Sequence, residues 1–529
     1  MKSSTIKEMI ENSVLLYPNN IAFYEKENKE YKGITYNELY SDMVNLGNKL
    51  IDMGLKDKNI AIIGKNSYEW GLSYLTTVCG VGKVVPLDKE LKKEELDKQL
   101  NNLNVDLIIY SKEQKKKLDH NKYKTIRMQD EMKELIKEGS NLDNNYTNTY
   151  IDPNNVAVYL FTSGTTGNSK IVMLSNKNIM HNINNIDQFI KIDETDRFFS
   201  VLPMNHTLEC TGGFLTPLSI GASMIHLDSL KYIQKDMIKT KPTIIIGVPR
   251  VIELFDQKIT NEIEKKGKTK LVKAARFITN FVPALKRPIF KDIHESFGSD
   301  LKTIIVGGAP VDPLVSKRLR EYGFTILQGY GLTECAPLVA GNSYNNFKDD
   351  KVGHPLRDTD IKIINTNSDG IGEICVKGPQ VMLGYYNNEK ATKEAIDEDG
   401  YFHTGDLGYV DKSGFIKIVG RCKNVIITSN GKNVYPEEIE VEINKSKYIK
   451  QAIVSAKDNI ITVEIVLTED IQQKIKEIPS FKEEITKIIN EYIKEINSKL
   501  AEYKKVKKVE LRDKPFEETS TQKIKRYVK

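Results

Sequence analysis

Residues 158–175, VYLFTSGTTGNSKIVMLS, decide the fold that this sequence predicts. They begin within a β-branched and aromatic run, residues 156–161, which predicts a buried strand. Only Thr, Ser, Gly and Asn follow this run until Lys170. Glycines let the backbone turn with its N–H groups inward, while hydroxyls and an ammonium add donors for phosphate oxygens. A strand, a turn and a cation in this order favour a loop that binds a polyphosphate.

The loop differs from a Walker A loop, because Ser169 stands where that pattern requires its second glycine, with four residues between it and Gly164. A surface hairpin built from ordinary turn residues is the alternative interpretation of the loop alone. The candidate phosphate-binding residues are Thr162, Ser163, Gly164, Thr165, Thr166, Gly167 and Lys170.

Composition and charge place the chain among ordinary globular proteins. Charged residues make up 28% of the 529 residues and hydrophobic residues 40%, and the net charge of +6 is small, so no nucleic-acid partner is expected. The five cysteines are scattered and form no C-x-x-C pair, which is typical of reduced thiols. No apolar run has the length of a signal peptide or a membrane span. We expect a cytoplasmic protein of at least two domains, with peripheral membrane contact left open.

Short apolar runs alternate with amphipathic segments through most of the chain. The predicted strands are residues 60–63, 84–87, 107–110, 198–202, 223–227, 243–247, 303–306 and 324–327. The predicted helices are residues 35–53, 68–79 and 94–103. This alternation predicts an α/β fold in which helices cover largely parallel sheets.

The character of the sequence changes after about Gly420. The predicted elements there are helices over residues 433–444 and 480–500 and strands over 451–456, 460–467 and 506–511. We therefore expect a large domain over residues 1–421 and a small α+β domain over residues 422–529. Within the large domain, residues 253–296 are strongly basic and helical, and alone they predict a solvated helical insertion.

Two motifs that follow apolar strands carry groups suited to a nucleotide. In GGAP, residues 307–310, small residues leave room for a flat ligand beside the backbone. In QGYGLTE, residues 328–334, Tyr330 can stack on a purine, Thr333 can bind a phosphate oxygen, and Glu334 can bind Mg²⁺. A tight turn before a capped helix is the alternative for this second motif. The candidate nucleotide-binding residues are Gly308, Ala309, Pro310, Gln328, Gly329, Tyr330, Gly331 and Thr333.

Two single residues are less specific signals. Asp406 lies between glycines in residues 399–424, a run that otherwise predicts a plain β-meander, and its carboxylate can accept both hydroxyls of a ribose. His206, in LPMNHTLE, belongs to a residue type that is more often packed in a core than catalytic when it stands alone.

Together these motifs resemble the adenylate-forming superfamily, which includes acyl-CoA synthetases, luciferases and the adenylation domains of peptide synthetases. The phosphate loop is similar to T-S-G-T-T-G-x-P-K-G, with Ser169 and Ile171 in place of proline and glycine. The superfamily motifs Y-G-x-T-E, T-G-D and G-R match at Tyr330, Asp406 and Arg421. They occur in the order that the superfamily uses.

The resemblance implies roles for residues that carry no signal alone. The terminal motif T-x-x-G-K-x-x-R, with Gln522 in place of its glycine, makes Lys523 the catalytic lysine and Lys525 the alternative. By the same resemblance, Arg421 is expected to reach the ribose and phosphates, and Lys423 is expected to be the hinge of a mobile C-terminal domain. The remaining implied roles are metal binding by Thr162 and Glu334, shaping of the acyl site by His206, and lining of the thiol path by Gly431 and Lys432.

The resemblance also implies an activity. It predicts an ATP-dependent, AMP-forming ligase that uses Mg²⁺ and transfers an acyl group to CoA. The segment GVPRV, residues 247–251, followed by a long helical region, is similar to synthetases that act on long fatty acids, and we expect a medium- to long-chain acid. The alternatives are a ligase that loads an acyl carrier protein, an amino-acid or aryl-acid adenylating domain, a luciferase-type oxidation, and a catalytically silent nucleotide-binding module.

Overall fold

The structure, a computed structural model, describes residues 2–28, 30–162, 169–227, 232–428, 432–457, 460–519, 524 and 526. The chain divides into two units. The first unit contains residues 1–360 and 376–402, and the second contains residues 361–375 and 403–529. This division differs from a single cut after residue 421, because strands from residues 361–375 and 403–421 form one sheet that belongs to the second unit.

The strand that leads into the phosphate loop belongs to a seven-stranded sheet of the first unit. In spatial order its strands are β18 (Gly384–Tyr385), β8 (Lys170–Ser175), β7 (Val156–Thr162), β4 (Gly82–Leu87), β3 (Lys58–Ile63), β5 (Leu107–Tyr110) and β6 (Lys124–Arg127). The strands from β7 to β6 run parallel, as the alternating pattern predicts. Strands β8 and β18 are antiparallel to their neighbours. Strand β6 lies in a polar segment for which the sequence predicted no strand.

Five of the six helices of this region begin after a residue whose side chain caps them. The six helices are α1 (Ile6–Leu16), α2 (Tyr36–Asp52), α3 (Tyr68–Thr76), α4 (Lys93–Asn102), α5 (Glu131–Gly139) and α6 (Asn176–Asn184). Thr35 and Glu38 form a capping box at the start of α2, and Gly54 follows its end with a φ of +77°. Helix α6 also starts with a capping box, from Ser175 and Asn178, so β8 leads directly into it.

A nine-stranded sheet forms the rest of the first unit's core. In spatial order its strands are β15 (His354–Pro355), β14 (Leu338–Gly341), β13 (Thr325–Gly331), β12 (Thr303–Val306), β11 (Ile244–Gly247), β9 (Arg197–Ser200), β10 (Ser223–His226), β1 (Ile21–Glu27) and β2 (Glu30–Thr35). The six strands from β13 to β1 run parallel. Their short isoleucine-rich sequences, such as Thr-Ile-Ile-Val in β12, are typical of strands covered on both faces.

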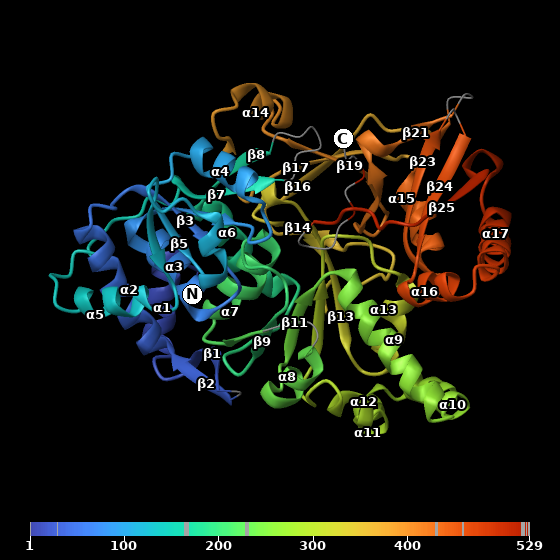
Figure 1. Ribbon diagram of the computed structural model, residues 1–529, viewed down its shortest axis with the longest axis horizontal. Coiled ribbons are helices and arrows are strands. Elements are labelled where there is room, and N and C mark those ends of the chain that lie inside the picture. The colour runs from blue at the N-terminus through green and yellow to red at the C-terminus, as the bar shows by residue number, and fades with distance from the viewer. Residues whose placement is uncertain are drawn as a thin grey trace. The chain divides into compact units, whose positions relative to one another are not determined.

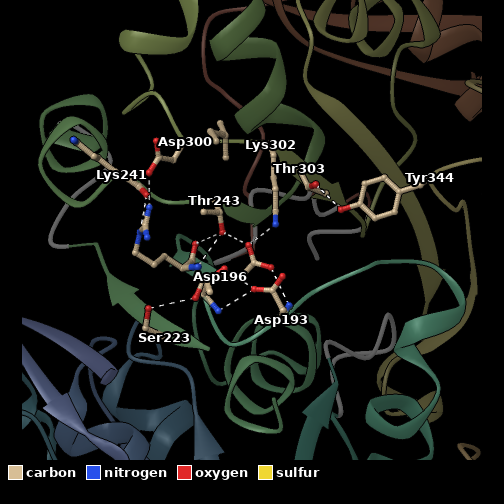
Figure 2. Close-up of polar contacts among 12 residues, drawn as sticks. Asp193, Asp196, Ser223, Lys241, Thr243, Asp300, Lys302, Thr303 and Tyr344 are labelled. Atoms are coloured by element: carbon tan, nitrogen blue, oxygen red, sulfur yellow. Dashed lines mark hydrogen bonds and ion pairs between the residues drawn. The ribbon is translucent and has the colours of Figure 1, made fainter. Parts of the chain in front are cut away.

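The amino-terminal edge of this sheet is fastened by a buried carboxylate, Asp196, whose side chain is 1% exposed (Figure 2). Its Oδ1 atom accepts a hydrogen bond of 2.6 Å from the Thr243 hydroxyl and lies 2.7 Å from the Lys302 ammonium. Its backbone carbonyl accepts the N–H of Ser223. Asp196 thus joins the residues that begin β9, β10, β11 and β12, and this edge has a structural role.

The predicted basic helical segment is present as α9 (Pro249–Lys265), α10 (Thr269–Phe281), α11 (Lys286–Ile289) and α12 (Lys291–Glu295). Figure 1 shows α9 leading outwards from the sheet, with α10 at its far end. The other helices of the first unit after α6 are α7 (Thr216–Leu218), α8 (Ile233–Thr240), α13 (Pro313–Glu321) and α14 (Glu389–Ala395). Across the described ranges of both units, no helix has the length and apolar character needed to cross a membrane.

The second unit contains three sheets. Their strands are β16 (Asp360–Ile364), β17 (Gly372–Lys377), β19 (Phe402–Val410) and β20 (Ile416–Arg421) in the first, β21 (Ile426–Ile427) and β22 (Asn433–Val434) in the second, and β23 (Ile449–Lys457), β24 (Ile460–Leu467) and β25 (Lys508–Arg512) in the third. The helices are α15 (Pro436–Ile443), α16 (Glu469–Glu477) and α17 (Phe481–Lys499). The predicted α+β character is confirmed. Helix α15 begins later than predicted, because Asn433 and Val434 pair with β21.

Candidate functional site

The two predicted nucleotide motifs of the first unit lie at one edge of the nine-stranded sheet. Strands β12 and β13 are parallel neighbours, and Val306 pairs with Gln328. The residues that follow these two positions therefore lie at the same carboxyl edge of the sheet. Ligands bind at this edge in open α/β sheets. Gly308, Ala309 and Pro310 are exposed there, and Gly308 has a φ of +85°, which favours glycine.

Residues 328–331 of the motif are part of β13, and the tight turn of the alternative interpretation is present only after the strand, at Thr333–Cys335. The strand continues because residues 329–331 pair with β14. A side chain at Gly331 would place its Cβ 2.1 Å from the carbonyl oxygen of Pro337, so only glycine allows this close pairing. Tyr330 is 8% exposed, and the Gln328 amide donates to the carbonyl of Asp349. The strand therefore fixes both side chains before any ligand arrives.

Glu334 is held by a residue that the sequence analysis missed. It lies in a short 3₁₀ turn, Thr333–Cys335, and its Oε1 atom accepts a 3.0 Å hydrogen bond from the Tyr385 hydroxyl. The Lys170 ammonium lies 4.4 Å from the centre of the Tyr385 ring. Burial is the main cause that raises the pKa of Tyr385, and the charge of the Glu334 carboxylate is the second. The phenol therefore stays protonated and donates its hydrogen bond. Tyr385 thus connects the loop lysine to the predicted metal ligand.

The phosphate loop is described only at its two ends. Thr162 is half-buried and its hydroxyl donates to the backbone carbonyl of Lys170, which pairs with it across β7 and β8. These two residues therefore stand where strand pairing brings the loop ends together. The predicted phosphate-binding residues Ser163, Gly164, Thr165, Thr166 and Gly167 lie outside the described residues.

A cavity of about 80 Å³ opens beside the nucleotide motifs, inside the first unit. Its walls are largely apolar and include Phe189, Phe198, Ile246, Ile305 and Leu327. Leu208, Thr211 and Gly212, from a π-helix over Leu208–Leu215, cover one side. Gln328 and Gly329, two predicted nucleotide-binding residues, also line it. The cavity is therefore continuous with the candidate nucleotide edge.

His206 and Glu209 lie at the start of that π-helix. The carbonyl of His206 accepts the N–H of Cys210, so His206 stands one turn before the part of the helix that covers the cavity. Glu209 is 0% exposed, and neither carboxylate oxygen has a hydrogen-bond partner of good geometry among the described residues. Burial raises the pKa of Glu209 to about 8, although nearby Ser200 and the N–H of Leu202 lower it. Glu209 is therefore protonated near neutral pH.

In the second unit, the predicted ribose carboxylate and the predicted arginine pair with each other. Asp406 and Arg421 are opposite residues of β19 and β20, and the Arg421 Nε atom lies 2.7 Å from Asp406 Oδ1. Asp406 is 4% exposed, whereas the Arg421 side chain is 44% exposed. The run that contains them is a β-hairpin, as the β-meander interpretation predicts. This hairpin also places Asp406 and Arg421 on one surface.

The part of β19 that presents Asp406 is held by Glu373, another residue that the sequence analysis missed. The N–H of Gly405 donates to Glu373 Oε1 at 3.0 Å. The same carboxylate lies 3.5 Å from His403 Nδ1, which lies 3.7 Å from Cys375 Sγ. An oxygen, nitrogen and sulfur set of this kind could hold a divalent metal. Hydrogen bonding among these groups also accounts for their positions.

The remaining predicted residues of the second unit are only partly described. Lys423 lies in a 3₁₀ turn, Cys422–Asn424, within this unit. Lys432 is exposed, and its N–H donates to the Thr428 hydroxyl. Gly431, Lys523 and the alternative Lys525 lie outside the described residues.

Two described residues of the C-terminal segment contact the rest of the second unit. Ile524 pairs with Glu518 in an antiparallel bridge, and Arg526 forms an ion pair with Glu440 of α15. Burial raises the pKa of Glu440 to about 7, although the Arg526 guanidinium lowers it. These contacts were not predicted, since a basic tail alone is usually solvated.

Comparison with known families agrees with this geometry. The AMP-binding enzyme family matches residues 10–386, and the AMP-binding enzyme C-terminal domain matches residues 423–528. The chain therefore belongs to the AMP-binding enzyme family, and the resemblance drawn from its motifs is confirmed.

Its curated relatives include named fatty-acid ligases. The chain is 30% identical over 379 residues to the long-chain-fatty-acid–[acyl-carrier-protein] ligase AEE15, chloroplastic, of Arabidopsis thaliana. This alignment covers 60% of this chain and 52% of that protein. It is 27% identical over 488 residues to the long-chain-fatty-acid–CoA ligase ACSBG2 of Rattus norvegicus, with 83% of this chain and 73% of that protein covered. The chain spans about half the length of the first of these relatives.

Solved structures share the fold along nearly the whole chain. The o-succinylbenzoate coenzyme A synthetase MenE of Bacillus subtilis, in complex with ATP and magnesium ion, matches with a TM-score of 0.75 and 24% identity over 98% of each chain. The ATP-bound RpMatB-BxBclM chimera B1 matches with a TM-score of 0.78 and 24% identity, covering 99% of this chain and 97% of that one. The predicted fold class is therefore confirmed.

Proposed function

We propose that this chain is an ATP-dependent, AMP-forming ligase that activates a fatty acid and transfers it to a thiol. The observation that carries the proposal is the position of Gln328 and Gly329, which belong to the nucleotide motif and also line the apolar cavity. A ligase of this type needs a nucleotide phosphate and an acyl carboxylate next to each other, and residues shared by both subsites meet this need.

Each unit, taken by itself, carries described residues that suit one part of the nucleotide. In the first unit, Tyr330 would contact the adenine and Lys170 the phosphates. Glu334, a partly exposed carboxylate fixed by the Tyr385 hydroxyl, suits Mg²⁺, with Thr162 as the second ligand. Bound there, Mg²⁺ would neutralise charge on the phosphate oxygens.

In the second unit, the ribose would meet the surface formed by Asp406 and Arg421. Asp406 Oδ1 already accepts from Arg421, and a carboxylate has further lone pairs for ribose hydroxyls. The exposed guanidinium of Arg421 can turn its remaining donors to a phosphate. Desolvation of Asp406 would strengthen both interactions.

The chemistry would proceed in two steps. A carboxylate oxygen attacks the α-phosphorus of ATP and pyrophosphate leaves, which gives an acyl adenylate. A thiol then attacks the acyl carbon, AMP leaves, and a thioester forms. We assign Lys523 to stabilise the charge that develops in the first step and His206 to shape the acyl end of the site. Lys423 would be the hinge of a domain rotation between the steps, and Gly431 and Lys432 would line the thiol path.

The apolar walls of the cavity favour an acid with an alkyl chain. Its volume of about 80 Å³ holds about three groups the size of a water molecule, at ~30 Å³ each. The cavity as it stands therefore accepts only a short part of the chain. The names of the relatives and the GVPRV segment extend the proposal to medium and long chains.

CoA is the proposed thiol, and the phosphopantetheine of an acyl carrier protein is the second candidate, because a carrier-protein ligase is among the similar proteins. We also propose that the functional domains are residues 1–421 and 422–529, a boundary supported by the C-terminal match that begins at residue 423. The cytoplasmic location stays a prediction.

A substrate panel tests the proposal. The full chain is mixed with ATP, Mg²⁺ and acids from acetate to stearate, and pyrophosphate and thioester are measured with CoA or with phosphopantetheinylated carrier protein. We expect pyrophosphate release that depends on a medium or long acid, followed by thioester formation with CoA. Thioester with the carrier protein alone would favour the second candidate. ATP binding without pyrophosphate release for any acid would contradict the proposal and identify a catalytically silent module.

A further inference from the structure

An exposed apolar surface lies on the helical insertion of the first unit, away from the candidate site. Seven large apolar side chains between residues 271 and 289 are exposed, and they account for seven of the 21 large apolar residues exposed in the described ranges. The residues of this α10–α11 surface are Leu271, Phe277, Ile278, Phe281, Val282, Leu285 and Ile289. Such a concentration marks an interaction site, whereas single exposed apolar residues are normal.

Helix α10 presents this surface because its other face is fixed. Thr279 is fully buried, and Arg276 forms an ion pair with Glu321 of α13. Leu271 and Ile278, seven residues apart, lie on the opposite face and are 66% and 54% exposed. The packing against α13 therefore holds the apolar face outwards.

The most exposed members of the surface are two phenylalanines. Phe277 and Phe281 are 67% and 75% exposed, and their ring centroids are 5.2 Å apart. They follow the helical spacing of four residues, so both rings project from one face of α10. Aromatic rings of this kind enter the boundary between lipid headgroups and acyl chains.

The charge of the insertion indicates the partner. Residues 265–291 contain nine Lys and Arg residues and no Asp or Glu, whereas the whole chain has a net charge of +6. The rest of the chain therefore carries 6 − 9 = −3. Lys268, Lys270 and Lys273 are exposed on or beside α10, next to the apolar face. A basic segment this free of acidic residues complements an anionic partner.

We propose that the α10–α11 surface binds the surface of an anionic phospholipid bilayer. An amphipathic helix with lysines beside a Leu/Phe/Ile face lies in the membrane interface, with its apolar side chains in the acyl boundary and its ammonium groups at the phosphates. A surface that binds another protein would be expected to contain acidic residues that pair with Lys and Arg of that protein. Residues 265–291 contain no acidic residue. Membrane binding by this surface does not require the catalytic activity proposed above.

Co-sedimentation of the full chain with vesicles tests the apolar part of the surface. We expect the wild type to pellet with phosphatidylcholine vesicles that contain about 30% phosphatidylglycerol and to stay in solution with phosphatidylcholine alone. The double variant Phe277→Gln/Phe281→Gln should lose at least about tenfold in binding. The matched control Leu15→Gln/Ile478→Gln changes two apolar residues that are exposed elsewhere, and it should bind as the wild type does.

A second set of variants tests the charge. Lys268→Gln/Lys270→Gln/Lys273→Gln should also weaken binding at least about tenfold, and about 1 M salt should release the wild type. Lys482→Gln/Lys487→Gln/Lys494→Gln, on the exposed face of α17, makes the same change in net charge and should leave binding unchanged. Equal losses in the two triple variants would mean that only net charge matters, which overturns the assignment to this surface.

Two further outcomes would overturn the proposal. One is a wild type that fails to pellet with anionic vesicles, or pellets equally with neutral ones. The other is sedimentation of the wild type as a dimer that Phe277→Gln/Phe281→Gln dissociates, without vesicle binding, which would assign the surface to a second copy of the chain. Since all the changed side chains are exposed, unfolding is not expected, and equal thermal midpoints of variants and wild type check this.

Discussion

The carboxyl edge of the nine-stranded sheet and the α10–α11 surface depart from ordinary burial in opposite ways. At the edge, polar groups are buried: Gln328 is 7% exposed, and Glu209, on the helix that covers the cavity, is 0% exposed. On the α10–α11 surface, Phe281 is 75% exposed. Both arrangements cost folding free energy. The difference indicates that the sheet edge encloses a small ligand with both polar and apolar parts. The α10–α11 surface instead suits contact with a large partner.

The largest expected effect concerns Lys523, the proposed catalytic lysine of adenylation. Lys523→Ala should slow acyl-adenylate formation about 10²- to 10³-fold, the usual loss for one preorganised donor to a developing charge. With synthetic acyl adenylate and CoA, the variant should form thioester at nearly the wild-type rate. The terminal motif assigns the role to position 523, so Lys525→Ala should be mild. The opposite ranking would transfer the role to Lys525.

Glu334→Gln sharpens the comparison within the edge itself. It keeps the size of the side chain but removes the charge that would bind Mg²⁺, so adenylation should fall about 10²-fold and require more Mg²⁺. Magnesium titrations of the initial rate measure this. Lys273→Gln, on α10, is the control and should leave the titration unchanged. Superimposed curves for Glu334→Gln and wild type would remove the metal assignment.

Glu209 tests whether the covering helix carries a buried protonated carboxyl. Its folded pKa of about 8 lies above its ordinary value of 4.5, so between these values the folded state holds the proton more tightly than the unfolded state. Stability should therefore fall as pH rises, by about 2 kcal/mol between pH 6 and pH 8 from this group alone. Glu209→Gln should remove that loss.

Urea unfolding at several pH values measures the effect. The exposed Glu484→Gln on α17 is the control and should keep the wild-type pH dependence. If the Glu209→Gln curve runs parallel to the wild-type curve across this range, Glu209 does not titrate as its burial requires.

The smallest expected effect concerns Tyr385→Phe. The ring beneath the Lys170 ammonium remains, and only the hydroxyl that donates to Glu334 is lost. One hydrogen bond contributes about 0.5–1.5 kcal/mol, so the Mg²⁺ requirement should rise about two- to tenfold. Tyr386→Phe, at the next residue, should match the wild type. A larger loss than that of Glu334→Gln would mean that Tyr385 acts on the reaction directly.

Local signals account for most of the predicted fold. The cap at Thr35 and the glycine at position 54 place α2 correctly, and the alternation of strands and helices predicts the parallel sheets. Strand β6 and helix α16 were missed, because each lies in a charged segment that contains few apolar residues. The motif at residues 328–331 was expected beyond its strand, and pairing with β14 extends the strand through it.

The missed residues of the site are those whose partners are distant in sequence. Tyr385 contacts Lys170 only because β18 pairs with β8 across more than two hundred residues. Glu373 supports Gly405 across a sheet. Neither residue has a local pattern that marks it. In the insertion, composition predicts a basic helix, but only the packing of Arg276 against Glu321 decides that the apolar face of α10 points outwards.

The central claim is that the carboxyl edge joins a fatty acid to the α-phosphate of ATP, and direct detection of the adenylate tests it best. The full chain is incubated with ATP, Mg²⁺ and a fatty acid carrying ¹⁸O in its carboxyl group, without any thiol, and the products are measured by mass spectrometry. The account predicts an acyl adenylate formed in step with pyrophosphate, and transfer of one ¹⁸O to AMP when CoA is added. Absence of acyl adenylate with every acid from acetate to stearate, while ATP is bound, would contradict it.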